Sequence, residues 1–279
     1  MRSLFESLTR KFVSLALLCL GLLSFAQSKW DLKFYTETVG REYFLYADNG
    51  EIMPMSVKFN FKLENLRNTL PDNSIIVVPP KVKKMLVAKL TPINLKQGNR
   101  FSYSNTFNFG DVTITKYDKD FIYDLPYPTG KSYSVYQGYN GKFSHSGKSA
   151  LDFSLKTGDA VHAARGGIVV EAIGEFDQGC PSISCAKYNN KILIMHSDGT
   201  FADYVHLKQN GILVKLGDEV EKGQLIGYSG NSGYTSGPHL HFSVFINGLN
   251  GEQTFIKTKF KTASGELYLQ EGKSYTKNN

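Results

Sequence analysis

Two histidines stand two residues apart near the end of the chain, in His239-Leu240-His241. In a β-strand, side chains two residues apart point to the same side of the sheet, so both imidazoles would leave one face together. Imidazole nitrogen is a good zinc ligand, and zinc sites often use such pairs. The pattern alone is weak evidence, because a histidine at a core edge or on the surface fits it equally well.

Two further candidates, His145 and Asp152, flank a glycine-containing loop that leads into the apolar segment 150–155. A carboxylate among apolar neighbours is costly to bury unless it is paired or bound to a metal. Together with His241, these residues make a three-ligand set. Such a set leaves one tetrahedral position open for water, as catalytic zinc sites do.

All six histidines lie between residues 145 and 241. His206 belongs to strand-like sequence and is a candidate for handling protons or charge rather than metal. His162 and His196 are interpreted as structural histidines, which are commoner than ligands.

The elements around these residues read as β structure. The segments 167–172, 191–196, 224–228 and 239–246 are strand-like, and no segment has the periodicity of an amphipathic helix. Earlier, residues 57–63 alternate apolar and polar side chains. Asn49-Gly50 predicts a hairpin, the segment 74–78 predicts a strand stopped by Pro79-Pro80, and 112–115 predicts another strand.

The resulting fold class is all-β, with a small β-sandwich-like domain preceding an antiparallel domain that carries the chemistry. The expected organisation is a signal peptide at 1–26, an N-terminal β domain at 27–125, the histidine-bearing domain at 126–254, and a C-terminal β extension and tail at 255–279. The N-terminal domain holds no histidine or cysteine after residue 26. We interpret it as a binding, spacing or gating module.

The first 26 residues have the layout of a secretory signal, with a basic start, an apolar run at 12–25 and small residues before a cleavage point after Ala26. The alternative is an uncleaved membrane anchor. The sequence therefore predicts an exported protein of the periplasm, cell envelope or extracellular space. No later segment is apolar enough to span a membrane.

Once the signal is removed, Cys180 and Cys185 are the remaining cysteines. In an oxidising compartment a nearby pair usually forms a disulfide, which is the favoured interpretation. The alternative is half of a structural zinc site, but a second ligand pair is not evident nearby.

The whole chain carries a net charge of +7, and the signal region contributes three basic residues and one acid, so the remainder is about +5. A basic surface suits an anionic partner such as cell-wall material, or it is simply well solvated. No basic cluster is dense enough to predict nucleic-acid binding.

Taken in order along the chain, the motifs resemble the lysostaphin/LytM-type zinc metallopeptidases, which are peptidoglycan endopeptidases with an antiparallel β fold. The resemblance covers about residues 135–246. The residues that carry it are His145 and Asp152, Tyr204-x-His206, Gly217-Asp218-x-Val220, Gly223-Gln224-x-Ile226-Gly227 and His239-x-His241-Phe242.

The resemblance implies zinc held by His145, Asp152 and His241, with His206 and His239 as catalytic histidines that are not ligands. One departure stands out. The family usually has His-x-x-x-Asp, whereas six residues separate His145 from Asp152 here, which predicts a longer loop.

The predicted function is hydrolysis of peptide bonds in peptidoglycan stem-peptide cross-links by zinc-activated water. The alternatives are a non-catalytic envelope protein that binds peptidoglycan or activates a cell-wall amidase, and a secreted protease of general proteins. The loop 229–234 and the segment around the two cysteines are candidates for the walls of a substrate groove.

Overall fold

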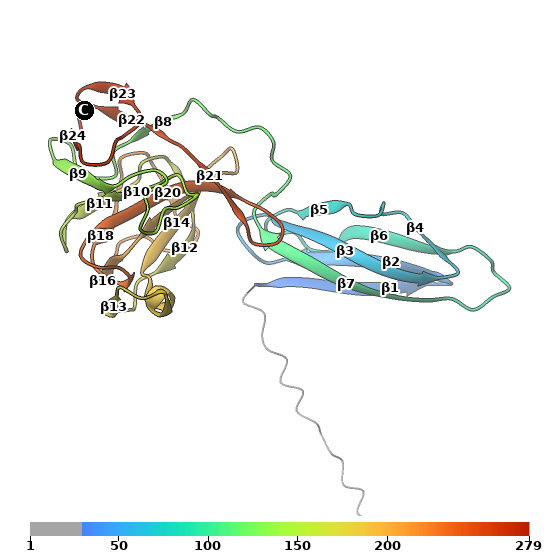
Figure 1. Cartoon of the computed structure of the whole chain (residues 1–279). Helices are drawn as coiled ribbons and strands as arrows, with labels where there is room; N and C mark the ends of the chain where they lie inside the picture. Colours follow the sequence, from blue (N-terminus) through green and yellow to red (C-terminus); the bar gives the residue numbers. More distant parts are fainter. Residues whose placement is uncertain (1–29, 279) are drawn as a thin grey trace, which may run out of the picture.

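The computed structural model describes residues 30–278. The predicted signal peptide and its cleavage point lie outside the described residues. Within them the regular structure is β-strand apart from one 3-10 helix, η1 (Ile183–Tyr188), which confirms the all-β prediction. No helix in this range is long and apolar enough to cross a membrane. The strands form two bodies that lie end to end (Figure 1).

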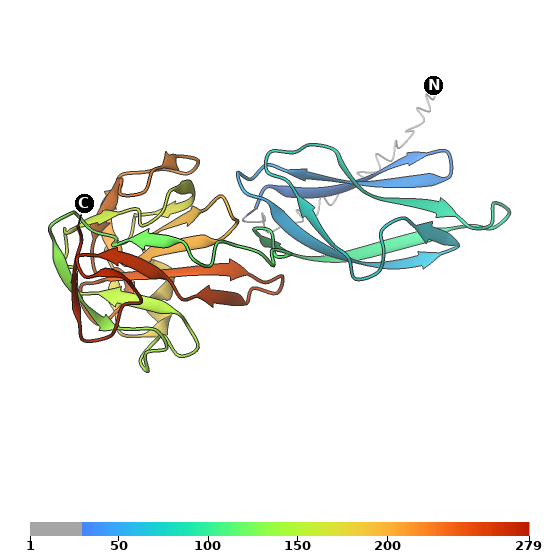
Figure 2. The same ribbon diagram turned by 90° about the horizontal axis from the view of Figure 1, so that it is seen from above.

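The first body consists of two antiparallel sheets that share one apolar core (Figure 2). The core takes Leu45 and Ala47 from one sheet and Val57 and Phe59 from the other, because alternate side chains of each strand point inward. In spatial order, one sheet contains β1 (Leu32–Val39), β2 (Glu42–Asn49), β6 (Met85–Pro92) and β4 (Leu66–Asn68), and the other contains β5 (Ile75–Val78), β3 (Met55–Glu64) and β7 (Arg100–Phe109).

Two local predictions in this body are wrong. Asn49 and Gly50 do not form a hairpin, because β2 and β3 belong to different sheets. The Asn49 amide instead donates hydrogen bonds to the carbonyls of Met53 and Val78, which holds the crossing chain. Residues 112–115 form no strand, because the Asp111 carboxylate accepts from the backbone N–H and the hydroxyl of Thr113 and makes a turn there.

The second body is built on a nine-stranded sheet. Its strands, in spatial order, are β17 (Glu219–Val220), β12 (Gly167–Ile173), β14 (Lys191–Met195), β15 (Phe201–Val205), β20 (Leu240–Asn247), β10 (Ala150–Phe153), β9 (Ser132–Gln137) and β24 (Ser274–Thr276), and β21 (Gln253–Ile256) also pairs with β20. The strands predicted at 167–172, 191–196 and 239–246 lie in this sheet, as β12, β14 and β20.

Smaller sheets complete the second body. They are β11 (Ala160–His162), β18 (Leu225–Ser229) and β16 (Leu207–Ile212); the parallel pair β13 (Gly179–Cys180) and β19 (Gly233–Tyr234); and β23 (Gly265–Leu267), β22 (Lys259–Thr262) and β8 (Ile122–Asp124). The C-terminal β extension expected at 255–279 contains the antiparallel pair β22–β23 and β24. Because β8 pairs with β22, the second body starts a few residues before the boundary predicted at 125/126.

The two faces of the large sheet have different roles. On β15, Ala202 and Tyr204 point into the main core, whereas Phe201, Asp203 and Val205 leave the opposite face. Strand β20 follows the same alternation, and its His241 lies directly across from Val205. The face opposite the core therefore presents polar and ionisable groups along the middle of the sheet.

Candidate metal centre and active site

The centre of the site lies on two paired strands. Asp152 on β10 stands directly across from His241 on β20, so both side chains leave the same face of the sheet. The Oδ1 atom of Asp152 is 2.9 Å from Nδ1 of His241 and 3.3 Å from Nε2 of His145. The ligand atoms of these three residues all lie within 4.8 Å of one another, which is a geometry that a single metal ion fits.

His145 reaches this centre from the loop that the sequence marked as unusually long. The loop folds back on itself: the His145 backbone N–H donates to the Gly141 carbonyl, and the Lys148 N–H donates to the His145 carbonyl. Gly147 takes a backbone φ of +72°, a conformation that glycine adopts without strain. The six intervening residues therefore do not separate the two side chains.

The environment of Asp152 favours its ionised form. Burial alone would raise the pKa of this carboxyl, but the adjacent imidazoles of His145 and His241 hold its pKa far below the usual value. A buried carboxylate that stays ionised is a strong ligand for a cation.

Two more histidines border the centre. The rings of His206 and His239 lie 4.4 Å apart, and Nε2 of His239 is 3.7 Å from the Asp152 carboxylate. His206 follows the end of β15, and His239 bridges to Gly230 just before β20. All five residues singled out in the sequence therefore meet at one place.

Hydrogen bonds fix which ring nitrogen of each outer histidine faces the site. Nδ1–H of His206 donates to the Ser232 carbonyl at 2.7 Å, and Nδ1–H of His239 donates to the Gly237 carbonyl at 2.8 Å. Nε2 is then the unprotonated nitrogen in each neutral ring. Burial lowers the pKa of His206 to about 3 and also lowers the pKa of His239, so both rings are neutral proton acceptors at neutral pH.

Tyr136 on β9 is a member of the site that the sequence did not single out. Its ring packs edge-on against His239 at 5.3 Å, and its hydroxyl is in hydrogen-bonding reach of Asp152. Burial, together with the Asp152 charge, raises the pKa of Tyr136 well above its usual value, so the hydroxyl keeps its proton. A strand at 132–137 was not predicted, and without it nothing in the sequence places this tyrosine near the histidines.

The site lies at the floor of a cavity of about 410 Å³. Ile183 and Asn189, from the cysteine segment, line one part of it, and Tyr234 and Thr235, from the loop before β20, line another. Phe143 adds an aromatic side chain that stacks on Tyr234 at 6.2 Å. The two loops expected to shape a groove thus both contribute to its walls.

Cys180 and Cys185 form a disulfide, as predicted. Strand β13, which contains Cys180, pairs with β19, which contains Tyr234, so the bond fastens η1 beside the cavity wall. The remaining histidines lie elsewhere. His162 donates from Nδ1 to the Gly223 carbonyl, and His196 donates from Nδ1 to the Gly166 carbonyl.

A family model described as peptidase family M23 matches residues 146–253. The chain carries an M23 peptidase domain. The matched range contains Asp152, His206, His239 and His241, and His145 stands one residue before it. The family resemblance seen in the sequence is therefore confirmed.

Several relatives share this domain. An uncharacterized metalloprotease of Buchnera aphidicola is 27% identical over 72% of this chain and 52% of its own length. Lysostaphin of Staphylococcus simulans is 30% identical over 59% of this chain and 33% of its own length. The peptidoglycan DD-endopeptidase ShyA of Vibrio cholerae is 34% identical over 36% of this chain and 20% of its own length.

Among solved structures, the catalytic domain of lysostaphin from Staphylococcus simulans is 31% identical, covering 44% of this chain and 87% of that domain, with a TM-score of 0.33. The chain spans about half the length of the Buchnera aphidicola relative and a third or less of the lengths of lysostaphin and ShyA.

Proposed function

We propose that this chain is an exported zinc metalloendopeptidase that hydrolyses peptide bonds in the stem-peptide cross-links of bacterial peptidoglycan. The observation that carries the proposal is the convergence of His145, Asp152 and His241 in an M23 domain, with two neutral histidines beside them. Relatives named lysostaphin and peptidoglycan DD-endopeptidase support the choice of substrate.

The donor set suits zinc. Two imidazole nitrogens and one carboxylate oxygen are the ligands that Zn²⁺ accepts in catalytic sites, and three protein ligands leave one position for substrate or water. When bound, Zn²⁺ supplies Lewis-acid chemistry, because it polarises a carbonyl group and makes water a stronger acid. His145, Asp152 and His241 would hold the ion. The hydrogen bond from Nδ1 of His145 to the Gly138 carbonyl orients that ligand.

The protein's own groups then manage the proton and the developing charge. The unprotonated Nε2 atoms of His206 and His239 are placed to take the proton of the attacking water and to return it to the leaving amine. The protonated hydroxyl of Tyr136 is a donor for the oxyanion that forms as the carbonyl is attacked.

The test is to incubate the chain from residue 27 onward with isolated peptidoglycan and to identify released fragments by mass spectrometry, while the zinc content of each variant is measured. We expect His145→Ala and His241→Ala to lose both zinc and cleavage. His206→Ala should keep zinc and lose a factor of about 10² to 10⁴ in kcat, because only a proton-handling group is removed.

His162→Ala is the matched control, because this histidine is hydrogen-bonded to the Gly223 carbonyl and is not part of the metal cluster. It should keep both zinc and activity. If the intact protein binds peptidoglycan but releases no peptide ends, the enzyme proposal is wrong. The binding or amidase-activating alternative would then take its place.

A further inference from the structure

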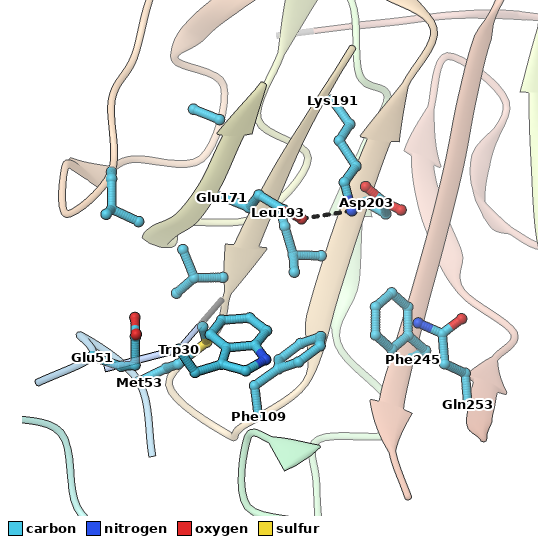
Figure 3. A pocket seen from close by; sticks show the side chains of 13 residues that line it. Trp30, Glu51, Met53, Phe109, Glu171, Lys191, Leu193, Asp203, Phe245 and Gln253 are labelled. Atoms are coloured by element: carbon cyan, nitrogen blue, oxygen red, sulfur yellow. Dashed lines mark ion pairs between the residues drawn. The ribbon is translucent and has the colours of Figure 1, made fainter. Parts of the chain in front are cut away.

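A second cavity, of about 400 Å³, lies where the two bodies meet (Figure 3). Four of its lining residues come from the first body: Trp30, Glu51, Met53 and Phe109. The rest come from the second body, mainly from the face of the large sheet that also bears the metal centre. The cavity therefore exists only because the N-terminal domain packs against the peptidase domain.

This interdomain cavity lies next to the catalytic cavity along the sheet. Asp203 and Gln253 line both of them. On β15, Val205 lies across from the ligand His241, and Asp203 is two residues further along the same face. Two strand residues cover about 7 Å, so an extended peptide in the catalytic groove can reach the interdomain cavity within a few residues.

The polar lining of the interdomain cavity has more acid than base. Glu51, Glu171 and Asp203 stand against one cation, Lys191, and burial raises the pKa of the Asp203 carboxyl above its usual value. Lys191 pairs with Glu171 at 2.6 Å. The Oδ1 atom of Asp203 is buried and has no hydrogen-bond partner among the described residues, although the side chain borders both cavities. A buried carboxylate oxygen without a donor is an unusual feature that a ligand's N–H group would satisfy.

The apolar lining is aromatic. Trp30 and Phe109 pack against each other at 5.5 Å on the side of the first body, and Phe245 lies on the sheet beside Gln253 (Figure 3). Aromatic faces attract ammonium groups and pack well against the methylene groups of an aliphatic chain. Acidic and aromatic walls together select a positively charged, flexible group.

We propose that the interdomain cavity binds the primary ammonium group of a lysine-like diamino residue in the peptide substrate, with Asp203 accepting its hydrogen bond. This deepens the proposed function and rests on it for the identity of the substrate. The N-terminal domain then forms one wall of a substrate-recognition site, which is a more specific role than binding, spacing or gating alone.

The chain supplies its own reporter for this cavity, because Trp30 is the single tryptophan of the sequence. The first probe is N-acetyl-Ala-Lys amide, titrated against the intact chain while tryptophan fluorescence is recorded. We expect a saturable change, and no such change with the same dipeptide acetylated on the lysine side chain. Asp203→Asn should weaken binding by about tenfold or more, as expected for loss of a charged hydrogen-bond partner.

Asp72→Asn is the matched control, because Asp72 is exposed in the first body and does not line the cavity. This variant should bind like the intact chain. A fluorescence response that is the same for both dipeptides, a response that Asp203→Asn does not weaken, or no response at all would overturn the proposal.

A cleavage assay separates this proposal from the proposed function. Cross-linked peptides that carry a free amine should be cut at a kcat/KM about tenfold above that of the same peptides with the amine acetylated. In Asp203→Asn the two values should become equal. His241→Ala should abolish all cleavage and keep the fluorescence response. If the intact chain cleaves both kinds of peptide equally well, the proposed ammonium site is wrong. The proposed endopeptidase activity is then still supported.

Discussion

At the residue scale, the site depends on which ring nitrogen each histidine presents. His145, His206 and His239 all donate from Nδ1 to a backbone carbonyl, which leaves Nε2 facing the centre. His241 presents Nδ1 to the same centre. Backbone carbonyls thus set the tautomers of His145, His206 and His239.

A buried histidine away from the metal centre makes stability depend on pH. His196 is 2% exposed, and its Nε2 has no hydrogen-bond partner among the described residues. Burial lowers the pKa of His196 to about 4, whereas in the unfolded chain it is about 6.5. Between these two values the unfolded state binds more protons, so the free energy of unfolding should fall by about 3 kcal/mol as the pH drops from 6.5 to 4.

The measurement is urea unfolding at several pH values for the intact chain and for His196→Asn, which keeps a donor near the Gly166 carbonyl and does not titrate. The difference in unfolding free energy between the two proteins should narrow towards pH 4. A difference that stays constant across this range would mean that His196 does not titrate on unfolding.

The residues of the candidate site could be found from the sequence, but their geometry could not. Strand alternation is enough to place His241, but not His206. Tyr204 points into the main core, and His206 reaches the site only because it follows the end of β15 with a backbone φ of +67°. The link between His145 and Asp152 depends on a loop conformation, which sequence spacing does not determine. Tyr136 escaped notice because its contacts with Asp152 and His239 arise from pairing between strands far apart in the chain.

At the element scale, strands with strong alternation were predicted and connections were not. Residues 57–63 lie in β3 because their apolar side chains fill the core between two sheets. Asn49-Gly50 has the composition of a hairpin turn. In the structure, however, the Asn49 side chain stabilises the segment that crosses from one sheet to the other. Turn composition reports local backbone preference and carries no information about which strand will be the partner.

The disulfide between Cys180 and Cys185 is an element-scale constraint on the catalytic cavity. It closes a short loop that presents Ile183 to the cavity, so its loss should destabilise this segment by up to about 2 kcal/mol. For the variant with Cys180→Ser and Cys185→Ser, we expect KM to rise several-fold while zinc content is unchanged, because a binding wall loosens and the ligands stay in place.

Limited proteolysis within 180–188 and steady-state kinetics on peptidoglycan fragments test this together. Reductant should reproduce the effect in the intact chain and have none on the double serine variant. If KM and protease sensitivity both stay the same, the segment is held by β13–β19 pairing rather than by the bond.

At the scale of the whole molecule, the two bodies share a small apolar core of their own. Met53 of the first body packs with Val170, Leu193, Phe201 and Phe245 of the large sheet. This cluster is on the same face as the metal centre and opposite the main core. The sequence predicted two β domains, but not how they pack against each other. Strand alternation predicts which face of a sheet a side chain lies on, and it does not predict which residues of the other domain that side chain contacts.

Hydrogen bonds reinforce this contact. The Asn108 amide donates to the Gly248 carbonyl at 2.7 Å, and the Asn247 amide donates to the Phe109 carbonyl at 3.1 Å. The end of β7 is thereby tied to the turn between β20 and β21. A domain joined to the catalytic sheet in this way should unfold with it rather than separately.

Phe109 is the side chain on which that coupling most depends, since its ring packs edge-on against Phe201 at 5.3 Å and against Trp30 at 5.5 Å. We expect the intact chain to show a single calorimetric unfolding transition and Phe109→Ala to show two, because each body keeps its own core once the shared cluster is broken.

Phe107→Ala is the matched control. It lies on the same strand but packs inside the first body, so it should lower the unfolding temperature without splitting the transition. A single transition in Phe109→Ala would assign the coupling to the asparagine hydrogen bonds instead.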